Sequence, residues 1–123
     1  MMIVVGGVAA AVQVLIFAME SLWWNRPAVR RRFRMSDAQA EASRLFAFNQ
    51  GAYNLFLAVG IVVGLGLVAA GRPEWGRLLV GWNAASMVGA ACVLLASAKG
   101  LWRGALIQGA PGALALVGAI LGG

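Results

Sequence analysis

Four long apolar runs dominate the pattern of hydrophobic and polar positions, and short polar or basic segments separate them. A membrane-spanning helix needs about 20 mostly apolar residues, because each residue advances it by about 1.5 Å across a hydrocarbon layer of about 30 Å. The runs are long enough and predict spans at about residues 1–24, 44–70, 75–98 and 101–121. We therefore expect an all-α, polytopic membrane protein whose single domain, residues 1–123, is a bundle of four transmembrane helices.

The breaks between these runs carry the usual signals for helix ends. Asn25-Arg26-Pro27 ends the first run, Gly71-Arg72-Pro73 ends the second, and Lys99-Gly100 predicts a tight turn before the fourth. Ser36-Asp37-Ala38-Gln39 has the order of a capping box, which predicts a helix that starts there and continues into the second span. Pro111 lies inside the fourth run and predicts a kink.

Composition agrees with a membrane protein, and the position of the charges predicts its orientation. Hydrophobic residues make up 62% of the chain and charged residues 11%, whereas soluble domains are about half apolar and about a quarter charged. The first loop, residues 25–43, and its flank at Arg44 hold most of the positive charge behind the net value of +6. Such a loop typically faces anionic lipid in the cytoplasm. Because no nucleic-acid-reading module accompanies the charge, we expect no nucleic-acid partner.

Counting Lys and Arg around each loop extends this prediction to the whole topology. The first and third loops carry eight such residues and the second loop carries two. The positive-inside rule then places the first and third loops in the cytoplasm and both termini outside, an N-out/C-out arrangement. The expected location is the bacterial inner (cytoplasmic) membrane.

A single carboxylate, Glu20, interrupts the first apolar run. An ionisable group is costly in hydrocarbon, and by default it marks a functional site. Amide side chains in the second and fourth spans lie at about the same distance from their cytoplasmic ends as Glu20 does, so we expect them to meet it. Glu20 is the candidate catalytic residue. The candidate ligand-binding residues are Gln13, Asn49, Gln50, Tyr53, Asn54 and Gln108.

Two interpretations of this group stay open. In one, the amides hydrogen-bond across helices and hold Glu20, with a contribution of about 1 kcal/mol or less for each bond. In the other, they line a cavity for a lipophilic small molecule, and Glu20 exchanges a proton with that molecule. The chain has no His and a single cysteine, Cys92, so we predict no metal site and no cofactor.

Three kinds of function fit these features. The first is an enzyme that uses Glu20 for an isomerisation, a cyclisation or an epoxide opening, with a variant in which Arg30 to Arg34 hold a phosphate head group. The second is a small proton-coupled transporter, which would have to dimerise to enclose a path. The third is an accessory subunit of a membrane complex. The glycine-rich spans predict close helix packing and a homo-oligomer.

Three stretches of the chain also resemble a known family. They are Phe17-Ala18-Met19-Glu20-Ser21-Leu22-Trp23, Asn49-Gln50-Gly51-Ala52-Tyr53-Asn54-Leu55-Phe56-Leu57-Ala58 and Ile107-Gln108-Gly109-Ala110-Pro111. Their order and spacing are similar to those of the DUF1304 family of small bacterial four-helix membrane proteins. The resemblance implies the four-helix fold and the polar site, but no reaction, because the family name denotes unknown function. It also implies a His early in the first helix, where this chain has Gln13.

Overall fold

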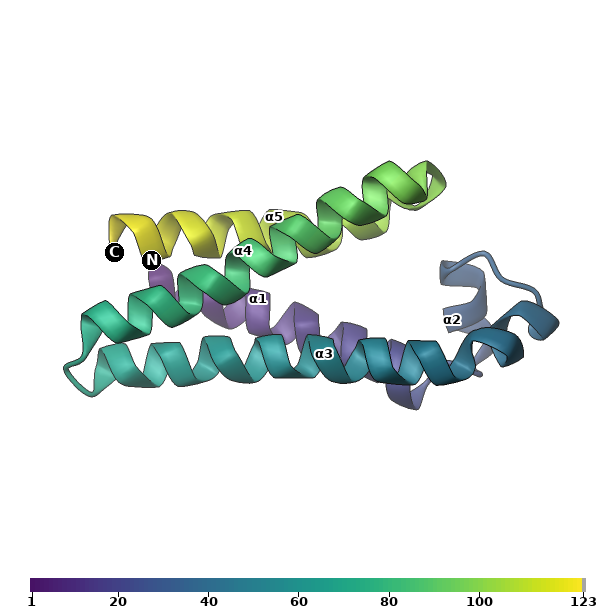
Figure 1. Ribbon diagram of the computed structural model, residues 1–123, viewed down its shortest axis with the longest axis horizontal. Helices are drawn as coiled ribbons and strands as arrows, with labels where there is room; N and C mark the ends of the chain where they lie inside the picture. Colours follow the sequence, from purple (N-terminus) through teal and green to yellow (C-terminus); the bar gives the residue numbers. More distant parts are fainter. Residues whose placement is uncertain (123) are drawn as a thin grey trace.

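The structure, a computed structural model, describes residues 1–122, and its regular elements are all helices (Figure 1). In chain order they are α1 (Met2–Phe17), the π-helix η1 (Ala18–Leu22), α2 (Pro27–Arg32), α3 (Asp37–Ala69), α4 (Pro73–Ser97), the 3-10 turn η2 (Lys99–Leu101) and α5 (Trp102–Leu121). Four segments are long and apolar enough to cross a membrane: α1 with η1, α3, α4, and η2 with α5. The predicted all-α, four-span fold is confirmed.

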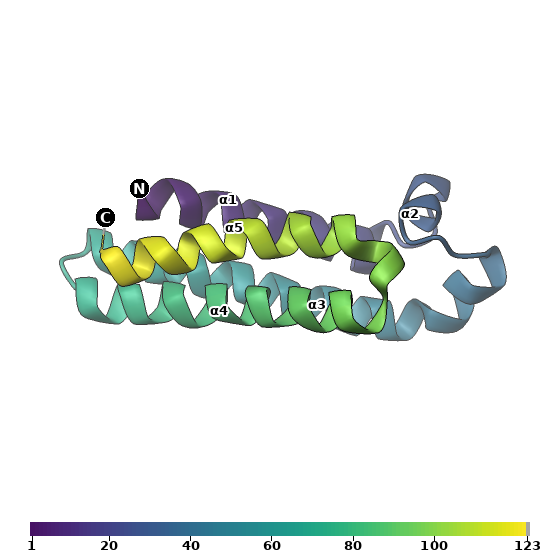
Figure 2. The same cartoon turned by 90° about the horizontal axis from the view of Figure 1, so that it is seen from above.

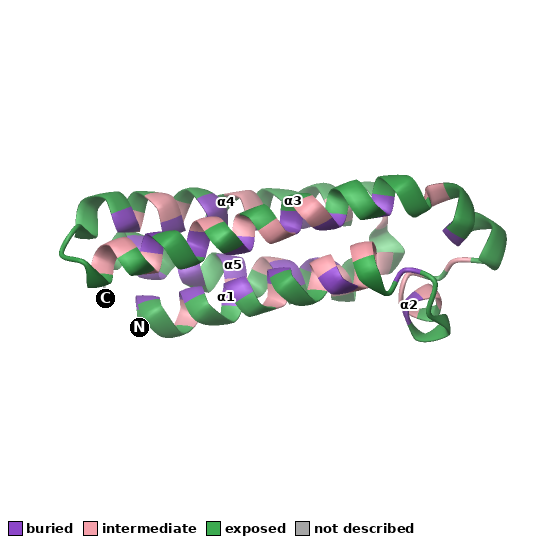
Figure 3. Ribbon diagram, turned by 90° about the horizontal axis from the view of Figure 1, so that it is seen from below, coloured by how far each residue is buried: buried purple, intermediate pink, exposed green. Residues whose placement is uncertain are grey.

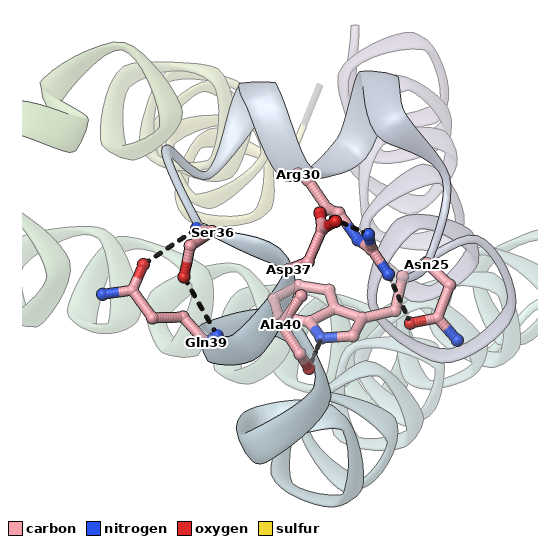
Figure 4. A network of polar contacts seen from close by, with 7 residues as sticks. Asn25, Arg30, Ser36, Asp37, Gln39 and Ala40 are labelled. Atoms are coloured by element: carbon pink, nitrogen blue, oxygen red, sulfur yellow. Dashed lines mark hydrogen bonds and ion pairs between the residues drawn. The ribbon is translucent and has the colours of Figure 1, made fainter.

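Local sequence signals explain where several of these helices begin and end. The hydroxyl of Ser36 accepts a hydrogen bond from the backbone N–H of Gln39 at 3.2 Å, and the Gln39 side chain accepts one from the Ser36 N–H at 2.9 Å (Figure 4). The predicted capping box at the start of α3 is therefore confirmed. Gly71 follows α3 with a φ of +81°, a conformation that glycine adopts without a steric penalty. Helix α5 continues through Pro111.

The four long helices form a closed ring in which α1 packs on α3, α3 on α4, α4 on α5, and α5 on α1. Both termini lie at one end of the bundle (Figures 1 and 2). Buried positions lie on the sides of the helices that face one another (Figure 3). The core is built largely from small side chains, with Ile61, Val80 and Met87 as its largest fully buried apolar residues. Small residues allow helix backbones to approach closely in lipid, which compensates for the weak hydrophobic drive there.

Helix α3 extends beyond the rest of the bundle. Its 33 residues correspond to about 50 Å at about 1.5 Å per residue, well above the hydrocarbon thickness of about 30 Å. The extension lies at the end opposite the termini, where the short helix α2 also lies (Figures 1 and 2). The first turns of α3 within residues 25–43 agree with the predicted capping box, whereas the short helix α2 was not predicted.

Helix α2 is held against the start of α3 by several specific contacts. The indole N–H of buried Trp24 donates to the carbonyl oxygen of Ala40 at 2.8 Å, and the Trp24 ring packs on that of Phe33 with centroids 5.2 Å apart. Arg30 forms an ion pair with Asp37 at 2.6 Å (Figure 4). The basic segment between the first two spans is therefore folded onto the bundle end.

Candidate functional site

A chain of hydrogen bonds crosses the interior of the bundle and ends at the carboxyl group of Glu20. The Gln108 amide N–H donates to Gln13 Oε1 at 3.4 Å, and the Gln13 amide N–H donates to Asn54 Oδ1 at 3.1 Å. The Asn54 amide N–H then donates to Glu20 Oε1 at 2.7 Å. The chain connects α5, α1, α3 and η1. Gln13, at its centre, has no exposed surface.

All three bonds of this chain point in the same direction, from Gln108 towards Glu20. Hydrogen bonds arranged head to tail polarise one another, so the arrangement strengthens the final donor at Asn54. Within residues 1–122, the bond from Asn54 is the only side-chain hydrogen bond to the Glu20 carboxyl group. One carboxyl oxygen of Glu20 is therefore held by Asn54, and the other accepts no hydrogen bond from the described side chains.

A π-helical turn carries Glu20. In η1 the backbone N–H of Trp23 donates to the carbonyl oxygen of Ala18 at 2.7 Å, five residues earlier. Single π-turns inside longer helices are rare, and many occur at functional sites. Sequence analysis did not predict this turn.

Close docking of η1 on α3 fixes the position of this turn. The hydroxyl of Ser21 donates to the carbonyl oxygen of Phe48 at 2.8 Å. At Gly51 of α3 there is no room for a side chain, because a Cβ there would collide with Ser21 Oγ and lie 3.1 Å from Glu20 Cβ. The glycine therefore allows the carboxylate-bearing turn to approach α3.

A cavity of about 280 Å³ lies beside the hydrogen-bond chain; we call it the Glu20 cavity. Helices α1, η1, α2, α3, α4, η2 and α5, or the residues next to them, contribute to its wall. Its lining residues are Leu15, Ile16, Met19, Glu20, Arg32, Phe33, Gln50, Asn54, Ala90, Leu94, Leu101, Gly104, Ile107 and Gln108. The wall thus combines one carboxyl group, three amides and one guanidinium group with apolar side chains.

The structure brings together most of the residues that the sequence suggested. Glu20, Asn54 and Gln108 are hydrogen-bonded and line the cavity, and Gln50 lines it from α3. Gln13 lies behind this wall as the link between Asn54 and Gln108.

Asn49 and Tyr53, by contrast, do not line the cavity. The Asn49 amide donates to the carbonyl oxygen of Leu45, one turn earlier in its own helix, at 2.9 Å. The Tyr53 side chain is 69% exposed. Successive helical residues are rotated by about 100°, so Asn49 lies about 140° around the helix from Asn54, whereas Gln50 lies only about 40° away. A similar depth in the membrane suggested Asn49, and closeness in sequence to the amides suggested Tyr53, but neither residue lines the Glu20 cavity.

Two cavity residues come from the basic segment. Phe33 was not among the predicted site residues, and Arg32 was considered only in the variant in which Arg30 to Arg34 hold a phosphate head group. Both residues lie in a basic segment of the sequence whose composition is typical of a cytoplasmic loop. Pro27, at the first position of α2, was the one signal for a helix there, because proline is common at that position. In the part of the chain that the structure describes, no three His, Cys, Asp or Glu side chains are grouped closely enough to hold a metal ion.

Comparison with known protein families agrees with this geometry. A family model described as a protein of unknown function, DUF1304, matches residues 7–120. The chain belongs to the DUF1304 family. The matched range of this DUF1304 protein includes the whole hydrogen-bond chain and every residue that lines the Glu20 cavity. No curated protein and no solved structure matched the chain.

Proposed function

We propose that this DUF1304 protein binds a lipophilic small molecule in the Glu20 cavity and that Glu20 exchanges a proton with it. The observation that carries this proposal is that the carboxyl group, held by Asn54, lines a cavity together with many apolar side chains. Small-molecule sites are typically lined by apolar side chains with a few placed polar groups. The arrangement therefore supports a binding site more than a simple contact between helices.

The size and walls of the cavity limit the ligand. A volume of about 280 Å³ is near the lower end of the usual range for small-molecule sites, about 300–1,000 Å³, which favours a small ligand. Leu15 and Ile107 line the cavity while about half of each side chain is exposed on the outer surface of the bundle. In a membrane that surface faces lipid. The apolar wall is thus continuous with the lipid-facing surface, which supports entry of a lipophilic molecule from the bilayer.

A carboxyl group that is fixed at one oxygen suits proton transfer. In an isomerisation, it would take a proton from one carbon of the ligand and return a proton to another, with no net oxidation or reduction. Cyclisation and epoxide opening likewise begin with protonation of the ligand by an acid. The neighbouring amides would orient the ligand and stabilise charge that develops in the transition state.

The interior beyond Gln13 favours this proposal over transport. Ile61, Val80 and Met87 fill the other half of the bundle and have no exposed surface. Among residues 1–122, the hydrogen-bond chain includes no residue from that half of the bundle. A buried polar residue there, Asn83, donates to the carbonyl oxygen of Leu79 in its own helix rather than to another helix. Within the described residues, a single copy of the bundle therefore has no hydrogen-bonded chain of side chains through that half.

Mass spectrometry of small molecules extracted from the purified protein tests the proposal. The wild type is compared with Glu20→Gln and with Glu41→Gln, which removes a carboxylate from the exposed surface of α3. We expect a defined lipophilic compound to be enriched with the wild type and the Glu41 variant, and to be altered or absent with Glu20→Gln. If all three proteins carry only bulk phospholipid, the proposal is wrong and a role as an accessory subunit is favoured.

Isotope labelling then separates catalysis from binding. The compound identified is incubated with the wild-type protein in D2O, and product formation and deuterium content are measured. A proton-transfer reaction at carbon introduces solvent deuterium into the product, and we expect Glu20→Gln to abolish it. A compound that is bound but returned unchanged and unlabelled would leave binding as the function and exclude catalysis of this kind.

A further inference from the structure

The arginines of α2 have different surroundings, although they are neighbours in sequence. Arg30 is already engaged, because it pairs with Asp37 at 2.6 Å and donates to the Asn25 side chain at 3.3 Å. Arg31 is exposed. Arg32 is partly buried and lines the Glu20 cavity. The ordinary role of a basic cytoplasmic segment, facing anionic lipid, accounts for Arg31 but not for an arginine that lines an internal cavity.

Among residues 1–122, Arg32 forms no ion pair. The ion pairs formed by residues 1–122 are Arg30 with Asp37 and Arg44 with Glu41. Arg32 and Glu20 line the same cavity without pairing. An anion that enters the cavity therefore meets a guanidinium group that has no internal carboxylate to displace.

The guanidinium group of Arg32 reaches helix α5 at Gly104. A Cβ at Gly104 would lie 3.6 Å from Arg32 Nη2, an ordinary van der Waals distance, so the side chain extends from α2 across to α5. Both residues line the cavity. Placing a cation in such a partly desolvated position is unfavourable when the cation is unpaired, and an anionic ligand removes that penalty.

We infer that the ligand of the Glu20 cavity is an anionic, single-chain amphiphile whose carboxylate or phosphate group is bound by Arg32. This inference rests on the proposed function and specifies its substrate class.

The groups that line the cavity match such a ligand. The guanidinium group offers paired N–H donors that match carboxylate and phosphate oxygens. The apolar wall, including Met19, Leu94 and Leu101, receives the chain. The cavity volume of about 280 Å³ is near the lower end of the usual range for small-molecule sites, which favours one chain over the two acyl chains of a phospholipid.

Native mass spectrometry of the full-length protein in phosphatidylcholine nanodiscs tests the inference. It measures the binding of three probes that share a ten-carbon alkyl chain: decyl phosphate, decanoate and decanol. The wild type is compared with Arg32→Gln and with Arg31→Gln, which removes the same charge one residue away. We expect Arg32→Gln to weaken binding of both anions by about tenfold or more, as for loss of a charge-assisted hydrogen bond. Arg31→Gln should bind all probes like the wild type, and decanol binding should be the same for all three proteins.

A third variant keeps the test decisive if Arg32→Gln does not fold. Arg32→Lys retains the positive charge, and we expect it to bind the anions more tightly than decanol. Equal weakening of anion binding by Arg31→Gln and Arg32→Gln would show that the general charge of the segment is responsible, and the inference would be wrong. The inference would also be wrong if phosphatidylglycerol in the nanodisc displaced decyl phosphate one for one, because the occupant would then be a bilayer head group.

The outcomes also separate this inference from the proposed function. If decanol and the two anions bind equally and substitution of Arg32 changes nothing, the anionic class is rejected while binding in the Glu20 cavity stands. If none of the three probes binds to the wild type and no extracted compound depends on Glu20, both the inference and the proposed function are rejected.

Discussion

At the scale of single residues, Gln13 is the link on which the polar interior depends. It is fully buried, its N–H donates to Asn54, and its carbonyl oxygen accepts from Gln108. Gln13→Leu keeps the volume but leaves an acceptor on Asn54 and a donor on Gln108 without partners. We expect the free energy of unfolding to fall by about 1–2 kcal/mol, since lost interhelical hydrogen bonds in membranes have modest effects but unpaired buried groups add to them. Equilibrium unfolding in mixed micelles with increasing dodecyl sulfate measures this change.

Asn49→Leu is the matched control for this prediction. The Asn49 amide bonds only to the backbone of its own helix and is exposed, so its removal should change the free energy of unfolding by no more than about 0.5 kcal/mol. Equal destabilisation by the two variants would show that the hydrogen-bond chain has no special role in stability.

Gly51 provides a second test at the residue scale, because it determines how closely the Glu20 turn approaches α3. A methyl group there would collide with Ser21 Oγ. We expect Gly51→Ala to destabilise the protein by about 1–3 kcal/mol, as overpacking usually does, and to lower ligand occupancy measured by mass spectrometry. A Cβ at Gly66, on the same helix, would have no atom within 4 Å. Gly66→Ala should therefore be neutral or stabilise the protein by up to about 1 kcal/mol. A neutral Gly51→Ala would mean that the close approach is not required.

At the scale of helices, the crossing of α3 and α4 depends on a pair of glycines. A Cβ at Gly76 would collide with the carbonyl oxygen of Gly64, and neither backbone can move without separating the helices. We expect Gly76→Ala to reduce the free energy of unfolding by at least about 2 kcal/mol, at the upper part of the usual range for overpacking. Gly89→Ala, also in α4, serves as the control, because a Cβ at Gly89 would have no atom within 4 Å. Similar unfolding curves for the two variants would contradict the proposed backbone contact.

The sequence predicted the long helices well because their determinants are local. Continuous apolar length predicted the four spans, and Ser36 with Gln39 predicted where α3 begins. The π-turn around Glu20 has no comparable local signal. It depends on Gly51 and on the bond from Ser21 to Phe48, which join residues about thirty positions apart, so only the folded chain reveals it.

At the scale of the whole molecule, the order of helices around the bundle could not be predicted from hydrophobicity. Helices that face lipid on the outside and other helices on the inside are apolar all round, so no stripe marks the buried face. The few polar residues carried that information instead. Gln13, Asn54 and Gln108 must face inwards, and the structure places all three in one network that links α1, α3 and α5.

The distribution of positive charge along the chain predicts how the molecule is oriented in the membrane. The end of the bundle with α2, η2 and the Glu20 cavity carries eight of the ten Lys and Arg residues, and the α3–α4 turn carries two. Basic residues near the ends of spans are retained in the cytoplasm. We therefore expect the Glu20 cavity to lie in the cytoplasmic half of a bacterial inner membrane, with both termini outside.

Cysteine labelling in intact bacterial cells tests this orientation. In a Cys92→Ser background, Glu41→Cys and Glu74→Cys place one thiol at each end of the bundle, both at exposed positions that carry an acidic residue in the natural chain. A membrane-impermeant maleimide should label Glu74→Cys in intact cells and Glu41→Cys only after the cells are opened. The reverse pattern would place the cavity and Arg32 on the outer side. An anionic ligand would then have to come from outside the cell, so this measurement also determines which pool of amphiphiles the cavity can sample.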